Sequence, residues 1–277
     1  MPTPRIARLA LASLSLLVAP PALAEYAAST LRLEAGTAIT FGEFKYSGAD
    51  VKIEKTIFNP RASVEFGLGG TSLSAGLEYA RSANQFTGTW KTGNGEVDIS
   101  RTELVVFARV GERERSNVRV GYRRFNYDFE DGQFTDGANI YLRASATGKL
   151  TTGLDVEGTV AGGDAVTFAL TAGATYFVGA DYAWSYSLNG GPTTSDSAKL
   201  SAYSVRLRPE ISFKVGDSLR VFGNWMLAAS SWKGTPSGGK DYAGVDVYSG
   251  IGVGARFDVR LGSAAAAAPA APAAAPN

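Results

Sequence analysis

The chain has 277 residues, which is enough for one large β domain or for two domains of ordinary size. Its 27 Lys and Arg residues nearly balance its 26 Asp and Glu residues, so the charge gives no reason to expect a nucleic-acid partner. The mean hydropathy of −0.03 excludes a bundle of membrane-spanning helices, and the absence of cysteine excludes a disulfide framework.

Residues 1–24 have the features of a signal peptide. Arg5 and Arg8 form a positive n-region, residues 9–18 form an apolar h-region, and residues 22–24 form a small-x-small cleavage site. The h-region is too short to cross about 30 Å of hydrocarbon as a helix. We therefore predict an exported protein, and any membrane crossing after the signal peptide must use β-strands.

From residue 31 onward, apolar and polar residues alternate in one short segment after another. In the last segment, Ile251, Val253 and Phe257 alternate with Gly252 and Arg256, and a period of two places the two sets on opposite faces of a β-strand. Such segments predict twelve strands of a barrel, in which a strand crosses a bilayer with tilt in about 9–11 residues. In chain order they cover 31–41, 62–68, 73–79, 103–110, 118–123, 140–146, 154–160, 166–176, 180–188, 203–214, 219–227 and 245–261.

Short turns and longer polar connections alternate between these segments. The short turns are at 69–70, 112–115, 147–152, 178–181 and 215–217, the longer connections are at 47–57, 83–97, 129–137, 189–197 and 234–241, and the link at 162–164 is short where a long one is due. This pattern predicts an all-β fold: an antiparallel up-and-down transmembrane β-barrel over residues 25–262, with twelve strands and closed by pairing of the first and last strands. If 177–190 is one bent strand rather than a hairpin, a barrel of ten strands is the alternative.

Alternation alone does not separate a membrane barrel from a soluble one, because the apolar set of a soluble barrel fills its interior. Twelve strands enclose more volume than Ala, Val and Leu could fill, and the signal peptide favours delivery to an outer membrane. Aromatic residues also gather at strand ends, as they do in interfacial girdles. These groups are Phe41, Phe44 and Tyr46; Phe86 and Trp90; Phe125, Tyr127 and Phe129; Trp184 and Tyr186; and Trp225 and Trp232.

On these features the chain resembles a Gram-negative outer-membrane β-barrel protein of the porin-like kind, over residues 25–262 and without a family-specific motif. The last strand also resembles the signal read by the outer-membrane assembly machinery, with Gly254, Phe257 and Val259, although the usual aromatic C-terminal residue is missing. The resemblance implies a cell outer-membrane location with both barrel termini periplasmic. It implies outer-membrane lipid, lipopolysaccharide and the assembly machinery as partners.

Residues 263–277 are rich in Ala and Pro, which is typical of flexible or semi-extended spacers. We expect a disordered periplasmic tail. The stretch resembles the hinge of OmpA-type proteins, which precedes a peptidoglycan-binding domain, so peptidoglycan is the candidate partner for the tail.

The chain contains no histidine, and together with the lack of cysteine this excludes a Ser-His or Cys-His nucleophile and a His-ligated metal site. The known outer-membrane barrel enzymes that the fold resembles rely on a histidine. Asp155 and Glu157 share a strand face and are expected to pair with arginines. The acidic segment 128–136 lacks the spacing of a calcium loop and is expected to be an exposed loop. We therefore predict no enzyme activity, no cofactor and no metal site.

Basic residues outnumber acidic ones on the predicted inward faces of the strands. Rings of Arg and Lys favour anions, so we predict a narrow passive channel for small solutes with a modest preference for anions, formed by a monomer. The alternative is a structural or adhesion barrel whose interior is closed by ion pairs and transports nothing. The residues predicted to form a basic track along the lumen are Arg119, Arg123, Arg206, Arg208, Arg220 and Arg256.

Overall fold

The computed structural model describes residues 26–46, 49–56, 59–90, 93–136, 139–188, 191–236 and 242–261. The predicted signal peptide and the predicted tail lie outside these ranges. The described residues contain no helix that is long and apolar enough to cross a membrane. The strands are β1 (Thr30–Tyr46), β2 (Ala49–Thr56), β3 (Asn59–Gly67), β4 (Leu73–Trp90), β5 (Gly93–Val110), β6 (Asn117–Asp136), β7 (Asn139–Gly162), β8 (Val166–Leu188), β9 (Thr194–Lys214), β10 (Leu219–Pro236) and β11 (Tyr242–Arg260).

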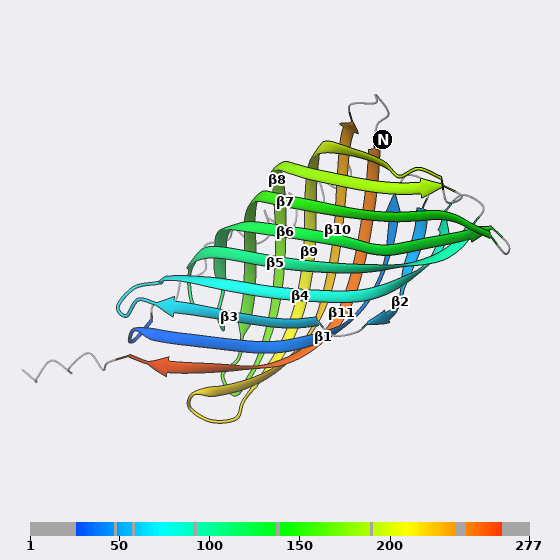
Figure 1. Cartoon of the computed structure of the whole chain (residues 1–277). Helices are drawn as coiled ribbons and strands as arrows, with labels where there is room; N and C mark the ends of the chain where they lie inside the picture. Colours follow the sequence, from blue (N-terminus) through cyan, green and yellow to red (C-terminus); the bar gives the residue numbers. More distant parts are fainter. Residues whose placement is uncertain are drawn as a thin grey trace, which may run out of the picture.

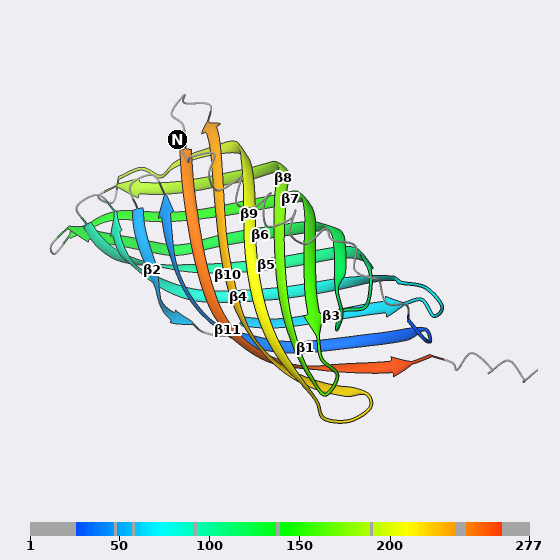
Figure 2. The same cartoon turned by 180° about the vertical axis from the view of Figure 1, so that it is seen from behind.

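The strands form one antiparallel sheet that closes into a barrel (Figures 1 and 2). From β4 onward each strand pairs with the next in the chain, and β1 pairs with β11 along its whole length, from Thr30 opposite Arg260 to Tyr46 opposite Gly244. The predicted closure by the first and last strands is therefore confirmed. It leaves no open edge whose backbone groups would be unsatisfied in lipid.

The closed ring has ten crossings, which is the alternative count and not the twelve that the alternation favoured. Strands β2 and β3 follow each other along the same crossing, since both pair with β1 on one side and with β4 on the other. The segments 147–152 and 178–181, predicted as turns, lie inside β7 and β8. They pair with each other, with Lys149 opposite Asp181 and Leu150 opposite Ala180. Ladder pairing, which keeps one register and skips only the two positions between Leu150 and Gly153, thus prevails over the local turn chemistry of both segments.

The connections differ at the two ends of the barrel. Residues 68–72, 111–116, 163–165 and 215–218 connect strands at the end where β1 begins and β11 finishes. The short link near 162–164 therefore lies on the short-turn side, and its apparent irregularity disappears. At the opposite end, many residues that were predicted to form loops belong to the strands. The acidic segment 128–136 is the end of β6, so the prediction of an exposed loop there is wrong.

The half of the barrel near the short turns has the polarity of a membrane barrel. Its large apolar side chains point outward, such as Ile251 with 59% of its surface exposed, whereas Arg256 on the opposite face is 2% exposed. The same arrangement is seen in β1, where Leu33 is exposed and Arg32 and Glu34 are buried. This confirms that the apolar face of the alternating segments is the outer one.

The part of β5 remote from the short turns has the opposite polarity. In β5, Val97 and Ile99 are buried inside the barrel, whereas Glu96 and Asp98 are exposed outside. The lengths of the strands explain this change. β5 has 18 residues and β7 has 24, whereas about 9–11 residues are enough to cross a bilayer, so the strands extend beyond it. This part of β5 therefore has the apolar inner face and polar outer face of a strand in a water-soluble barrel, whereas β1 and β11 keep Phe41 and Val247 exposed on the outside.

The aromatic residues divide between these two environments. Phe86, Phe125 and Trp232 point inward and are buried, so they are part of the interior and not of the predicted girdle. Phe41 and Trp225 point outward, as expected. Further outward aromatic residues that the predicted groups did not include are Tyr79, Tyr122 and Tyr176.

Candidate functional site in the barrel lumen

The interior holds a layer of ion pairs centred on Asp155 and Glu157 of β7. Asp155 accepts hydrogen bonds from Arg123 at 3.0 Å and from Arg206 at 2.5 Å. Glu157 pairs with Arg206 and with Arg119, each at 2.6 Å. The pairing that we expected for the two carboxylates is confirmed, and it compensates for burying them, since a buried carboxylate without partners is strongly unfavourable.

This layer continues to the opposite wall of the barrel. Glu78 of β4 accepts hydrogen bonds at 2.9 Å from Arg119 and from Arg61 of β3. Glu103 of β5 pairs with Arg101 at 2.9 Å and with Arg123. We call this set the central layer. Its members are Arg61, Glu78, Arg101, Glu103, Arg119, Arg123, Asp155, Glu157 and Arg206.

A second set of ion pairs closes the short-turn end, because the turn at 111–116 folds into the barrel mouth. We call this turn the plug turn. Its Arg113 pairs with Glu34 at 2.7 Å, and its Glu114 pairs with Arg32 at 2.9 Å and with Arg256 at 3.5 Å. The sequence predicted a short charged turn here, but opposite charges on β1 and β11 hold it inside the lumen.

Local backbone chemistry explains why the plug turn keeps its shape. Gly111 has a φ of 96°, a conformation that favours glycine. The side-chain amide of Asn117 donates to the carbonyl oxygens of Glu112 at 3.1 Å and of Arg115 at 2.9 Å. The turn therefore presents Arg113 and Glu114 to the lumen from a defined backbone.

The charges around the plug turn fix the ionisation of Glu114. Burial acts to raise the pKa of this carboxyl group, but Arg32, Arg256 and Arg113 outweigh that effect and lower the pKa to about 2. In the adjacent Glu112, burial and the negative charge of Glu114 raise the pKa above its usual value. Glu114 thus stays ionised, and its ion pairs stay formed, throughout the physiological pH range.

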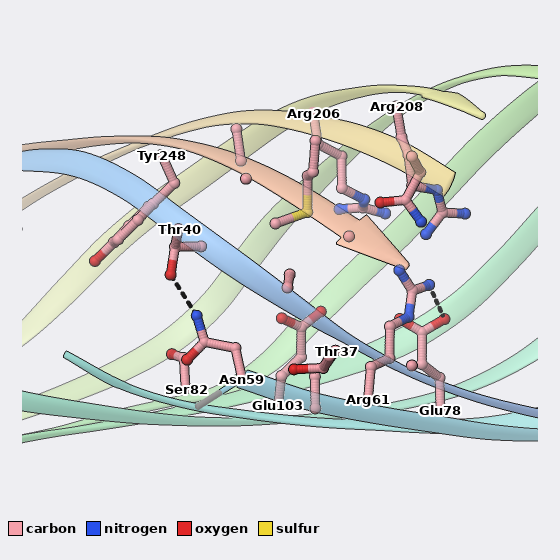
Figure 3. A pocket seen from close by; sticks show the side chains of 18 of the residues that line it. Thr37, Thr40, Asn59, Arg61, Glu78, Ser82, Glu103, Arg206, Arg208 and Tyr248 are labelled. Carbon is pink, nitrogen blue, oxygen red and sulfur yellow. Dashed lines mark hydrogen bonds and ion pairs between the residues drawn. The ribbon is translucent and has the colours of Figure 1, made fainter. Parts of the chain in front are cut away.

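A chamber of about 130 Å³ lies between the central layer and aromatic side chains of the half of the barrel remote from the short turns. Its wall includes Phe125 and Tyr248, and Arg101 stacks on Phe125 with 4.0 Å between the guanidinium carbon and the ring centre. In Figure 3, Arg206 and Arg208 project from β9 across the chamber from Arg61. The space is well above the roughly 10–15 Å³ that one water molecule requires.

Arg208 differs from the other arginines of the chamber. Its Nε atom is buried without a hydrogen-bond partner, and no carboxylate of a described residue lies within ion-pairing distance of its guanidinium group. Like charge also lies close by, because Arg206 and Arg61 line the same chamber. The chamber therefore contains a guanidinium group whose charge and donors remain available to a small anion.

The structure separates the six arginines of the predicted track. Arg119, Arg123 and Arg206 belong to the central layer. Arg256 pairs with Glu34 at 3.0 Å and with Glu210 at 2.9 Å near the mouth. Arg220 lies at the rim and donates to Thr167 at 3.1 Å. Arg208 lines the chamber together with Arg123 and Arg206, and it is the one of these three without a carboxylate partner among the described residues.

Sequence reasoning missed Arg113 and Glu114, because a charged turn between two strands is usually solvated. The excess of basic residues on the predicted inward faces gave no signal for this turn, because the turn adds one arginine and one glutamate to the lumen and leaves that excess unchanged.

No protein-family model and no curated protein sequence matches the chain. Among solved structures it is similar to the outer membrane protease OmpT from Escherichia coli, with a TM-score of 0.54 and 14% identity, covering 83% of this chain and 97% of that one. It also matches the translocator domain of autotransporter NalP from Neisseria meningitidis, with a TM-score of 0.44 and 12% identity, covering 91% of this chain and 94% of that one. This chain has the fold of a Gram-negative outer-membrane β-barrel protein.

At these identities the likeness concerns the fold alone. The similarity to a protease is therefore no evidence for protease activity in this chain. The expectation that the chain is not an enzyme stays a prediction. The chemistry of the lumen is therefore the basis for a functional proposal.

Proposed function

We propose that this barrel is a narrow passive channel of the outer membrane for small anionic solutes, and that the chamber is their binding site within the lumen. The observation that carries the proposal is Arg208, a guanidinium group on the chamber wall without a carboxylate partner. Burying an unpaired charge is costly. A solute anion in the chamber would offset that cost and would form charge-assisted hydrogen bonds.

The barriers along the lumen are made of side chains and one short turn. The central layer separates the chamber from the mouth, and the plug turn occupies the mouth itself. Passage then requires rearrangement of ion pairs, with no folded plug domain to displace. We place the short turns and both barrel termini on the periplasmic side, which is the usual arrangement of bacterial barrels, so that the plug turn faces the periplasm.

The second candidate is a structural or adhesion barrel with a closed interior. It is favoured by the burial of the ion pairs, since Asp155 has 0% of its surface exposed and Arg119 has 2%. An interior packed this closely resembles a protein core more than a water-filled pore.

Planar-bilayer recording distinguishes the two candidates. The purified barrel is expected to give small, stable conductance steps with a reversal potential that reports anion preference. Arg208→Gln should reduce that preference and Arg208→Glu should shift it toward cations, whereas Arg124→Gln, which changes an exposed arginine on the outer face of β6, should leave it unchanged. If the wild-type barrel gives no conductance steps, or if its ion selectivity is unchanged in the Arg208 variants, the closed structural barrel is supported.

A further inference from the structure

The ladder between β9 and β10 lacks two pairs at the position of Arg208, although the register is the same on both sides. The two strands pair at Asn224 opposite Glu210 and again at Leu227 opposite Leu207, but the two positions between them are unpaired. Pro209 lies in this gap and has no N–H to donate to the ladder. On its other side the wall is intact, with Leu170 of β8 opposite Pro209.

An apolar groove of about 960 Å³ lies on the outer face over the same gap. Phe168, Leu207, Pro209 and Trp225 are among its walls. The absence of a side chain at Gly223 contributes to this space, because a Cβ atom added there would meet no atom closer than 3.9 Å. The lipid side of the gap is therefore hollow and lined by apolar groups.

The outer groove and the inner chamber share part of their lining. Asn224, Gly252 and Val253 border both spaces. The lumen side of the ladder gap carries Arg208 and Met226, which line the chamber, and the lipid side carries Pro209 and Trp225, which line the groove. A charged site inside and an apolar site outside are thus separated by a wall in which two ladder pairs are missing.

We propose that the β9–β10 gap is a lateral window that binds a small amphipathic anion, with its anionic group on Arg208 and its apolar tail in the outer groove. The inference rests on the proposed function for the anion site at Arg208 and extends it to a second class of solute. Charge complementarity selects the head group, since Arg208 lacks a carboxylate partner. The apolar lining of the groove selects an apolar tail.

Equilibrium dialysis with radiolabelled ligands tests this on the intact barrel in detergent micelles, with protein-free micelles as the blank. The probes are octanoate, which has both a carboxylate and an apolar tail, acetate, which lacks the tail, and octanol, which lacks the charge. Octanoate should bind saturably and about tenfold or more tightly than either of the others, because only octanoate uses both subsites.

Two substitutions separate the subsites. Gly223→Leu fills the groove and should weaken octanoate binding about tenfold or more while sparing acetate. Arg208→Gln should weaken both. Gly162→Leu is the matched control, since a Cβ atom at Gly162 also meets open space, and it should change neither.

A disulfide across the gap tests the window directly, because the chain has no native cysteine. Pro209→Cys with Trp225→Cys should abolish octanoate binding when oxidised and restore it when reduced, whereas the pair Val205→Cys and Ala229→Cys, taken from an intact part of the same ladder, should have no effect. If octanoate binds equally well to Gly223→Leu and to the oxidised Pro209→Cys, Trp225→Cys variant, the lateral window is overturned. If the affinity for acetate is unchanged in Arg208→Gln, the proposed anion site is overturned instead, so the two failures are distinguishable.

Discussion

Replacing Asp155 by Asn removes the most fully buried carboxylate of the central layer. That carboxylate accepts hydrogen bonds from Thr175 at 2.6 Å, from Arg206 at 2.5 Å and from Arg123 at 3.0 Å. The amide keeps an acceptor oxygen but turns a donor toward guanidinium groups, so the arginines lose a counter-charge. Removing one partner of a buried ion pair costs about 3–5 kcal/mol, and 3 kcal/mol lowers the folding constant by about two orders of magnitude.

The assay is urea unfolding of the barrel in lipid vesicles, followed by tryptophan fluorescence. The variant Asp155→Asn should lose about 3 kcal/mol or more of unfolding free energy, and combining it with Arg206→Gln should cost less than the sum of the two single changes, with a coupling of about 1–3 kcal/mol. The control is Asp50→Asn, whose pairing with Lys45 at 3.6 Å is half exposed and is worth about 1 kcal/mol or less.

A cost below about 1 kcal/mol for Asp155→Asn, with strict additivity in the double variant, would refute the reasoning. It would mean that water already solvates the central layer, and that the lumen is open at this level.

Three further predictions use the same unfolding assay. The stability difference between wild type and Glu114→Gln should be fully present above about pH 5 and should vanish as the pH falls toward 2, because the pKa of Glu114 is lowered from 4.5 to about 2 and the unfolded chain binds the proton first; a difference that persists at pH 2 would contradict this. Ile99→Asp should cost about 3 kcal/mol or more by placing a charge on the apolar inner face of the remote part of β5, whereas Asp98→Ile on its outer face should cost little; equal costs would contradict the inverted polarity. Ile251→Arg should cost about 2–4 kcal/mol if that outward position faces the bilayer centre, and a negligible cost would place it outside the bilayer.

The sequence allowed the orientation of the strands to be predicted wherever one face carries charge and the other does not. In the last strand, Ile251 and Phe257 point outward and Arg256 points inward, as the alternation indicates. The closure of β1 on β11 also followed from the sequence, because an open edge in lipid is unfavourable. The same alternation misled us in the remote half of the barrel, where Phe86 and Phe125 were assigned to a girdle and lie inside.

The strand count could not be predicted, because it depends on pairing between segments far apart in the chain. Residues 147–152 and 178–181 each have the composition of a turn, and only their mutual pairing in β7 and β8 keeps both extended. The inward fold of the plug turn has a similar cause, since the partners of Arg113 and Glu114 lie on β1 and β11.

The sequence by itself predicted an outer-membrane type of barrel with a charged interior, because the period of two, the charges on one strand face and the features of a signal peptide are properties of the chain alone. Only the tertiary structure decided the ten crossings, because these depend on strand pairing between distant segments. It also decided which charges remain unpaired, because ion pairing depends on distances across the lumen. These distances place the plug turn in the mouth and leave Arg208 at the chamber without a carboxylate partner among the described residues.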